Sequence, residues 1–152
     1  MLMRSVLSIA LVLGLASAAM AAGSSSSSKP RPSKLAVAEK AVKVGNYGRA
    51  LKLLRNIVGG DPNNADAWNY IGFSHRNLNQ FDQSLKAYRK ALAIDPNHRG
   101  ANEYLGELYL KTGDLAKAKD RLKRLDEICT FGCPEFDDLK TAIGAFEAAH
   151  KG

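Results

Sequence analysis

The chain repeats itself at an interval of 34 residues, the distance from Asp61 to Asp95. Asp61-Pro62-Asn63 recurs as Asp95-Pro96-Asn97, and Tyr70-Ile71-Gly72 recurs as Tyr104-Leu105-Gly106. The same shift aligns three small residues at one position, namely Ala50, Ser84 and Ala118. A fixed period of this length indicates stacked supersecondary units, because one such unit cannot bury its apolar face alone.

Each unit has the pattern of two helices. From Asp66 to Leu78, and again from Asp82 to Ile94, apolar and small residues recur at helical spacing. Asn79-Gln80 separates these two segments and Asp95-Pro96-Asn97 ends the second, since Asn, Asp and Pro favour turns. The sequence therefore predicts an all-α solenoid of helical hairpins.

A 34-residue helix-turn-helix period of this composition resembles the tetratricopeptide-repeat (TPR) family. The residues that carry the resemblance are Trp68, Ile71, Gly72, Ser84, Tyr88, Ala91, Pro96, Leu105, Gly106, Tyr109 and Ala118. The family implies a right-handed superhelix, here of about three repeats plus a C-terminal capping helix. His75 stands where the family usually has Tyr, and the first repeat has Ala38 at the Gly position and no Trp.

The repeat positions have a physical reading. Gly72 and Gly106 are expected to remove a side chain where the two helices of one unit approach closely. Trp68 and Tyr88 are expected to fill the space between successive units. The pattern is informative about the fold and much less so about function.

Residues 1–21 have the three zones of a secretory signal peptide. Arg4 gives a positive start and Val6 to Ala16 form an apolar run. Ala19 and Ala21 fit the small-residue rule for cleavage after Ala21, with cleavage after Ala18 or Ala22 as the alternatives. The run is too short for a bilayer span, although an uncleaved N-terminal anchor is the alternative. Residues 22–33 are rich in Ser and Pro and are predicted to be a flexible linker. Export predicts a periplasmic location.

The rest of the chain divides into TPR 1 at residues 34–64, TPR 2 at 65–98, TPR 3 at 99–132 and a capping helix at 133–150. A further shift by one period places Phe136, Leu139 and Ile143 over inward-facing residues of the earlier repeats. Pro134 suits the first position of this last helix. Lys140 takes the Gly position, which is acceptable where no further helix follows.

Cys129 and Cys133 lie between the third repeat and the cap, in Cys-Thr-Phe-Gly-Cys. In an exported protein a disulfide is chemically available, and it would fix the angle at which the cap leaves the third repeat. A thiol-redox site and a metal site are the alternatives. The redox site would favour two residues between the cysteines, haem attachment would need a following His, and a metal would need more ligands.

The resemblance also implies that the first helices of the repeats line a concave groove that holds a peptide or partner helix. In the first repeat the groove positions are Leu35, Glu39 and Val42. The candidate partner-binding residues in the next two repeats are Asn69, Phe73, Arg76, Asn77, Glu103, Glu107, Leu110 and Lys111. Phe73 stands out as an aromatic on the solvent side of its helix, and Arg76 one turn away would suit a carboxylate. Alternatively the face is solvated and Phe73 packs on a neighbouring helix.

Basic residues recur on the second helices, as Arg49, Lys52 and Arg55, then Lys86, Arg89 and Lys90, then Lys117, Lys123 and Arg124. They predict a basic stripe on the outer face, suited to anionic lipid or an acidic partner, with ordinary solvation as the alternative. The formal net charge of +7 is too small to indicate a nucleic-acid partner.

No catalytic constellation is apparent. The chain has three His, no Gly-rich phosphate loop and no paired carboxylates beyond helix-surface charge. The sequence therefore predicts a non-catalytic scaffold, without a cofactor, that binds a protein or peptide in its groove. Two other classes stay open: a thiol-redox or metal-handling protein that uses Cys129 and Cys133, and a surface-associated protein that uses the basic stripe.

Overall fold

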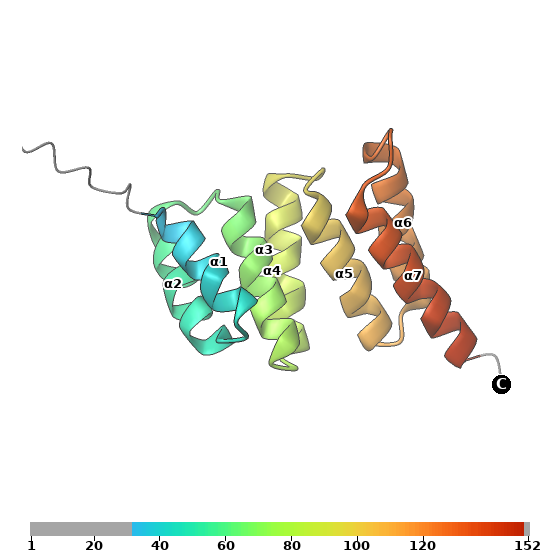
Figure 1. Ribbon diagram of the computed structural model, residues 1–152, viewed down its shortest axis with the longest axis horizontal. Helices are drawn as coiled ribbons and strands as arrows, with labels where there is room; N and C mark the ends of the chain where they lie inside the picture. The colour runs from blue at the N-terminus through green and yellow to red at the C-terminus, as the bar shows by residue number, and fades with distance from the viewer. Residues whose placement is uncertain (1–31, 151–152) are drawn as a thin grey trace, which may run out of the picture. The chain divides into compact units, whose positions relative to one another are not determined.

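The computed structural model describes residues 32–150, and this part of the chain has seven α-helices and no strand (Figure 1). The helices are α1 (Lys34–Lys43), α2 (Tyr47–Gly60), α3 (Ala65–Asn77), α4 (Phe81–Ile94), α5 (Arg99–Lys111), α6 (Leu115–Ile128) and α7 (Pro134–Ala149). The predicted all-α fold is confirmed. Each predicted repeat holds one helical pair, and α7 is the predicted cap. The predicted signal peptide and residues 22–31 of the predicted linker lie outside the described residues.

Side chains at the helix starts fix where most helices begin. Ser33, Asn46, Asn64 and Asp114 each accept a hydrogen bond from the backbone N–H three residues further on. Such N-caps satisfy donors that have no partner inside the helix. The predicted breaks between paired helices fall at Gly45, Asn79 and Gly113, which share one repeat position and all have positive φ. Glycine and asparagine tolerate this conformation best.

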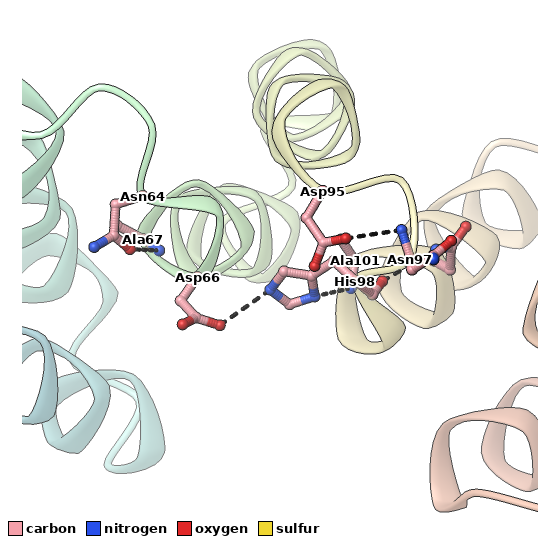
Figure 2. A network of polar contacts seen from close by, with 8 residues as sticks. Asn64, Asp66, Ala67, Asp95, Asn97, His98 and Ala101 are labelled. Atoms are coloured by element: carbon pink, nitrogen blue, oxygen red, sulfur yellow. Dashed lines mark hydrogen bonds and ion pairs between the residues drawn. The ribbon is translucent and has the colours of Figure 1, made fainter. Parts of the chain in front are cut away.

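His98 caps α5 in place of the Asn that caps α3 (Figure 2). Its Nδ1 accepts from the N–H of Ala101 at 3.2 Å, so its Nε2 carries the proton and faces Asp66 Oδ1 at 3.1 Å. Asn64, one period earlier, caps its own helix only, through the N–H of Ala67 at 2.9 Å. One imidazole therefore starts α5 and ties it to the first turn of α3.

His98→Ala is expected to lower the free energy of unfolding by about 1 kcal/mol, because it removes both the cap and the contact with Asp66. His98→Asn keeps a capping oxygen and should lose clearly less. Urea unfolding followed by circular dichroism measures both values. An equal loss in the two variants would show that the cap is not the stabilising contact.

Gly72 permits the close packing of α3 on α4. A Cβ built at Gly72 would lie 2.5 Å from Cδ1 and Cε1 of Tyr88, which is fully buried. The Ser84 hydroxyl donates to the Gly72 carbonyl oxygen at 2.8 Å, so the small residue at that position also joins the two helices. The expected close approach within this unit is confirmed. Tyr88 also packs with Leu105 and Leu108 of α5, and Trp68 packs on the core of the first repeat, so both fill junctions between units as predicted.

Gly106 corrects the corresponding prediction for the third repeat. The nearest atoms to a Cβ built there belong to Leu139 of α7, at 2.5 and 2.7 Å, rather than to the second helix of its own unit. The side chain of Leu139 is fully buried against α5 and α6. The cap therefore packs on the third repeat at Gly106. Lys140, the residue after Leu139, is exposed.

The helix contacts define an inner and an outer side of the array. Among the described residues, α1 contacts α3, α3 contacts α5 and α5 contacts α7, whereas α2, α4 and α6 do not contact one another. A row whose first helices touch while its second helices diverge is curved, with the first helices on the concave side. The groove implied by the resemblance is therefore lined by α1, α3, α5 and α7.

The cap begins as the sequence predicts. Pro134 is the first residue of α7, Cys133 is its N-cap, and Glu135 and Asp137 lie in its first turn. Cys129 is the C-cap of α6 and lies at disulfide distance from Cys133, with 5.7 Å between their Cα atoms. The two cysteines thus join the end of α6 to the start of α7. No helix within residues 32–150 is both long enough and apolar enough to cross a membrane.

Candidate functional site

An aromatic row lies along the groove. The ring of Phe73 lies 6.3 Å from that of Tyr47 and 4.9 Å from that of Tyr104, measured between centroids. Beside it is a hollow of about 250 Å³, the aromatic hollow, lined by Val42, Lys43, Tyr47, Tyr70, Phe73 and Tyr104. Phe73 therefore packs on neighbouring aromatic side chains, and it also forms part of the wall of an open apolar recess.

Arg76 is held in place by groups of its own chain. Its guanidinium carbon lies 5.2 Å from the ring centroids of both Phe73 and Tyr104, and an Nη1 proton is donated to Glu107 Oε2. Only 6% of Arg76 is exposed. The carboxylate that Arg76 was expected to take from a partner is thus supplied by α5, and Arg76 serves to hold the aromatic row together.

A second hollow is lined by Arg76, whose guanidinium packs on two rings of the aromatic hollow. Its volume is about 260 Å³, and its lining residues are Arg76, Asn77, Glu107, Leu110, Lys111 and Ala142. Five of these six were predicted groove residues, while Ala142 comes from the cap. Asn77 donates from Nδ2 to the carbonyl oxygen of Phe73, so it supports the end of α3.

Glu103 is the most deeply buried carboxylate in the groove. It is 7% exposed, and it makes no hydrogen bond or ion pair with any residue between 32 and 150. Burial, together with the nearby carboxylates of Asp138 and Glu135, raises the pKa of Glu103 to about 7, against a smaller opposite effect of Arg76. Glu135 also has an oxygen, Oε2, that is buried without a partner.

The remaining predicted groove residues lie nearer its edges or in the core. Asn69 is buried, with its Oδ1 unpartnered in the described part of the chain, and Val42 belongs to the N-terminal core while lining the aromatic hollow. Leu35 packs against that core. Glu39 pairs with Lys43 at 2.7 Å, and burial, with Glu39 nearby, raises the pKa of Tyr70 to about 12.

Sequence reasoning missed several groove residues. Tyr70, Tyr104 and Asp138 share one repeat position, so the period itself pointed to them as neighbours of the predicted set. Tyr47 and Ala142 gave no such signal, because Tyr47 begins a second helix and the repeat equivalents of Ala142, Ser74 and Leu108, are buried in the core.

Three larger hollows lie away from the aromatic row. One of about 390 Å³ is lined by residues of α1 and α2 at the N-terminal end, one of about 450 Å³ lies among α4, α5 and α6, and one of about 420 Å³ lies among α2, α3 and α4. The second is a wedge left where the outer helices diverge. The groove is the better candidate site because Arg76, which lines the second hollow, packs on two rings that line the aromatic hollow and has a buried Nε without a partner.

The residues of the two alternative sites are placed as follows. Cys129 is 8% and Cys133 5% exposed, so neither sulfur is open to a thiol partner. No group of three or more His, Cys, Asp or Glu within residues 32–150 could hold a metal ion. The basic residues of the predicted stripe lie on α2, α4 and α6, where Lys117 pairs with Asp114 and Arg124 with Glu127.

Three tetratricopeptide-repeat family profiles match the chain, over residues 35–76, 65–98 and 101–127. The chain belongs to the tetratricopeptide-repeat family. These matches cover both helices of the first two repeats and most of the third. No curated protein matches the chain in sequence.

Solved TPR structures share the fold at low sequence identity. One of them is the type III secretion chaperone SycD of Yersinia enterocolitica, in complex with a peptide of the translocator YopD. Its sequence is 22% identical and its TM-score is 0.65, and the match covers 76% of this chain and 88% of SycD. The first TPR of Spaghetti (RPAP3), bound to the HSP90 peptide SRMEEVD, is 18% identical with a TM-score of 0.66, over 75% and 93% of the two chains. The O-GlcNAc transferase of Thermobaculum terrenum is 19% identical with a TM-score of 0.66, over 72% of this TPR protein but 21% of the enzyme.

Proposed function

We propose that this TPR protein is a non-catalytic scaffold of the periplasm that binds an extended segment of a partner protein in its concave groove. The aromatic hollow carries the proposal, because an open apolar recess lined by four aromatic rings suits an apolar anchor side chain. The second hollow, next to it along the groove, would receive a following residue of the same segment.

The comparisons support a peptide partner. SycD and the first TPR of Spaghetti are both described in complex with a peptide, and their folds cover most of this chain. The likeness to the O-GlcNAc transferase covers 21% of that enzyme, so it gives no reason to propose catalysis here. The periplasmic location rests on the sequence of residues 1–21.

Phe73→Ala combined with Arg76→Ala is expected to abolish co-purification of the partner from periplasmic extract, because it removes one lining side chain from each of the two hollows. The double substitution also leaves Glu107 without its cation, so its folding must be checked by circular dichroism. Ala142→Trp avoids that difficulty, since it fills the second hollow and leaves every ion pair intact.

The matched control is Ala116→Trp, which makes the same change at an exposed position of α6. Quantitative mass spectrometry of the captured proteins should show one partner that is retained by the wild type and by Ala116→Trp and lost in both groove variants. Equal capture by all four proteins would refute the groove as the binding site.

A further inference from the structure

Three carboxylates lie near one another where α5 packs on the cap. Glu103 comes from α5, and Glu135 and Asp138 come from the first two turns of α7. We refer to these three residues as the acidic junction. None of them forms an ion pair within residues 32–150, although the whole chain carries a net charge of +7. The junction is thus a local excess of negative charge in a basic protein.

The acidic junction also contains a buried oxygen with no donor, Oε2 of Glu135. The residue Glu103 is 7% exposed, and its carboxylate makes no hydrogen bond in the described chain. Burying a carboxylate without a donor is unfavourable, and natural proteins seldom leave such groups unsatisfied. Asp138 is exposed, Glu135 is half-buried and Glu103 is buried, so the junction reaches the surface at Asp138.

The geometry favours an organic cation over a metal ion. The acidic junction does not bring its carboxylates close enough together to hold a metal, as no such group occurs within residues 32–150. A guanidinium or ammonium group carries several N–H donors and can serve oxygens that are further apart. Tyr104, adjacent to Glu103 in sequence, adds an aromatic ring that lines the neighbouring aromatic hollow.

We propose that the acidic junction is the subsite for a Lys or Arg side chain of the segment that lies in the groove. This inference rests on the proposed function and specifies the partner: a segment with an apolar anchor for the aromatic hollow and a basic residue towards α7. Charge complementarity supports the assignment, because the ligand supplies the donors that Glu103 and Glu135 lack. Arg76 makes no hydrogen bond with either of them, because its Nη1 donates to Glu107 and its Nε is buried without a partner.

The test uses a phage-displayed random dodecapeptide library selected on the purified full chain. Peptides that also bind Ala142→Trp are discarded, so that the retained set depends on the groove. We expect a Lys or Arg to be enriched at one position of the retained set. Replacing that residue by norleucine should weaken binding roughly tenfold or more to the wild type, and far less to Glu103→Gln combined with Glu135→Gln. Asp126→Asn, at an exposed carboxylate of α6, is the matched control and should leave the effect unchanged.

The outcomes separate the two proposals. If the groove-dependent peptides show no preference for Lys or Arg, the subsite is overturned and the scaffold function still stands. The same conclusion follows if replacement by norleucine weakens binding to the junction variant as much as binding to the wild type. Finding no groove-dependent peptide would overturn both. In a separate calorimetric experiment, calcium chloride is titrated into the protein without peptide. Saturable binding that is lost in the junction variant would show that the acidic junction is a metal site and would overturn the proposal of a subsite for a basic side chain.

Discussion

Gly72→Ala is expected to lower the free energy of unfolding by about 2–4 kcal/mol, although alanine is ordinarily the better helix former. The new Cβ would lie 2.5 Å from two ring carbons of Tyr88. That ring is fully buried against α5, so it cannot move without disturbing the next repeat. Chemical denaturation followed by circular dichroism measures the loss, which is a large share of the stability of a domain of this size.

The first repeat shows how the strain can be relieved. Ala38 and Leu54 occupy the positions of Gly72 and Tyr88 one period earlier, and both are fully buried. The two pairs are alternative ways of filling the same space. Gly72→Ala with Tyr88→Leu recreates the first pair, so the double variant should lose less than the sum of its two single changes, by about 1 kcal/mol or more. Strict additivity would show that the contact with Tyr88 is not what excludes a side chain at Gly72.

The repeat period was sufficient to predict the helices and their pairing. The Asp-Pro-Asn turns, the residues at position 79 and its equivalents, and the small residues at Ala50, Ser84 and Ala118 act locally, so each marks the same point of the units in which it recurs. The groove face was implied by the resemblance to the family, and the period carried that expectation from one repeat to the next, because residues one period apart face the same way along the array.

Contacts that leave the period could not be predicted in this way. Arg76 bonds to Glu107, 31 residues away, across α3 and α5, and no repeat position marks them as partners. Gly106 meets Leu139 rather than its own second helix, because the cap is a single helix that settles closer to the third repeat. Glu103 became notable only once its burial and the nearby carboxylates of α7 were visible.

Glu103→Gln is expected to stabilise the protein at pH 8 and to have little effect at pH 4. The pKa of Glu103 is about 7 in the folded protein and close to its ordinary value of 4.5 in the unfolded chain. Between these two values the folded state binds more protons than the unfolded state, so the stability of the wild type falls as pH rises through this window. Gln is neutral throughout, and above pH 7 the variant should be more stable by about 1–3 kcal/mol.

Glu107→Gln is the matched control, since it makes the same change one turn further along α5. Glu107 forms the ion pair with Arg76, so removing its charge leaves a buried guanidinium without its partner and should destabilise the protein at pH 8. Urea unfolding of the wild type, Glu103→Gln and Glu107→Gln between pH 4 and pH 8.5 measures the free energy of unfolding of each. The contributions of the other titrating groups cancel when the value for a variant is subtracted from that for the wild type. A difference between wild type and Glu103→Gln that does not grow with pH would show that Glu103 ionises normally, and the acidic junction would then be ordinary solvated charge.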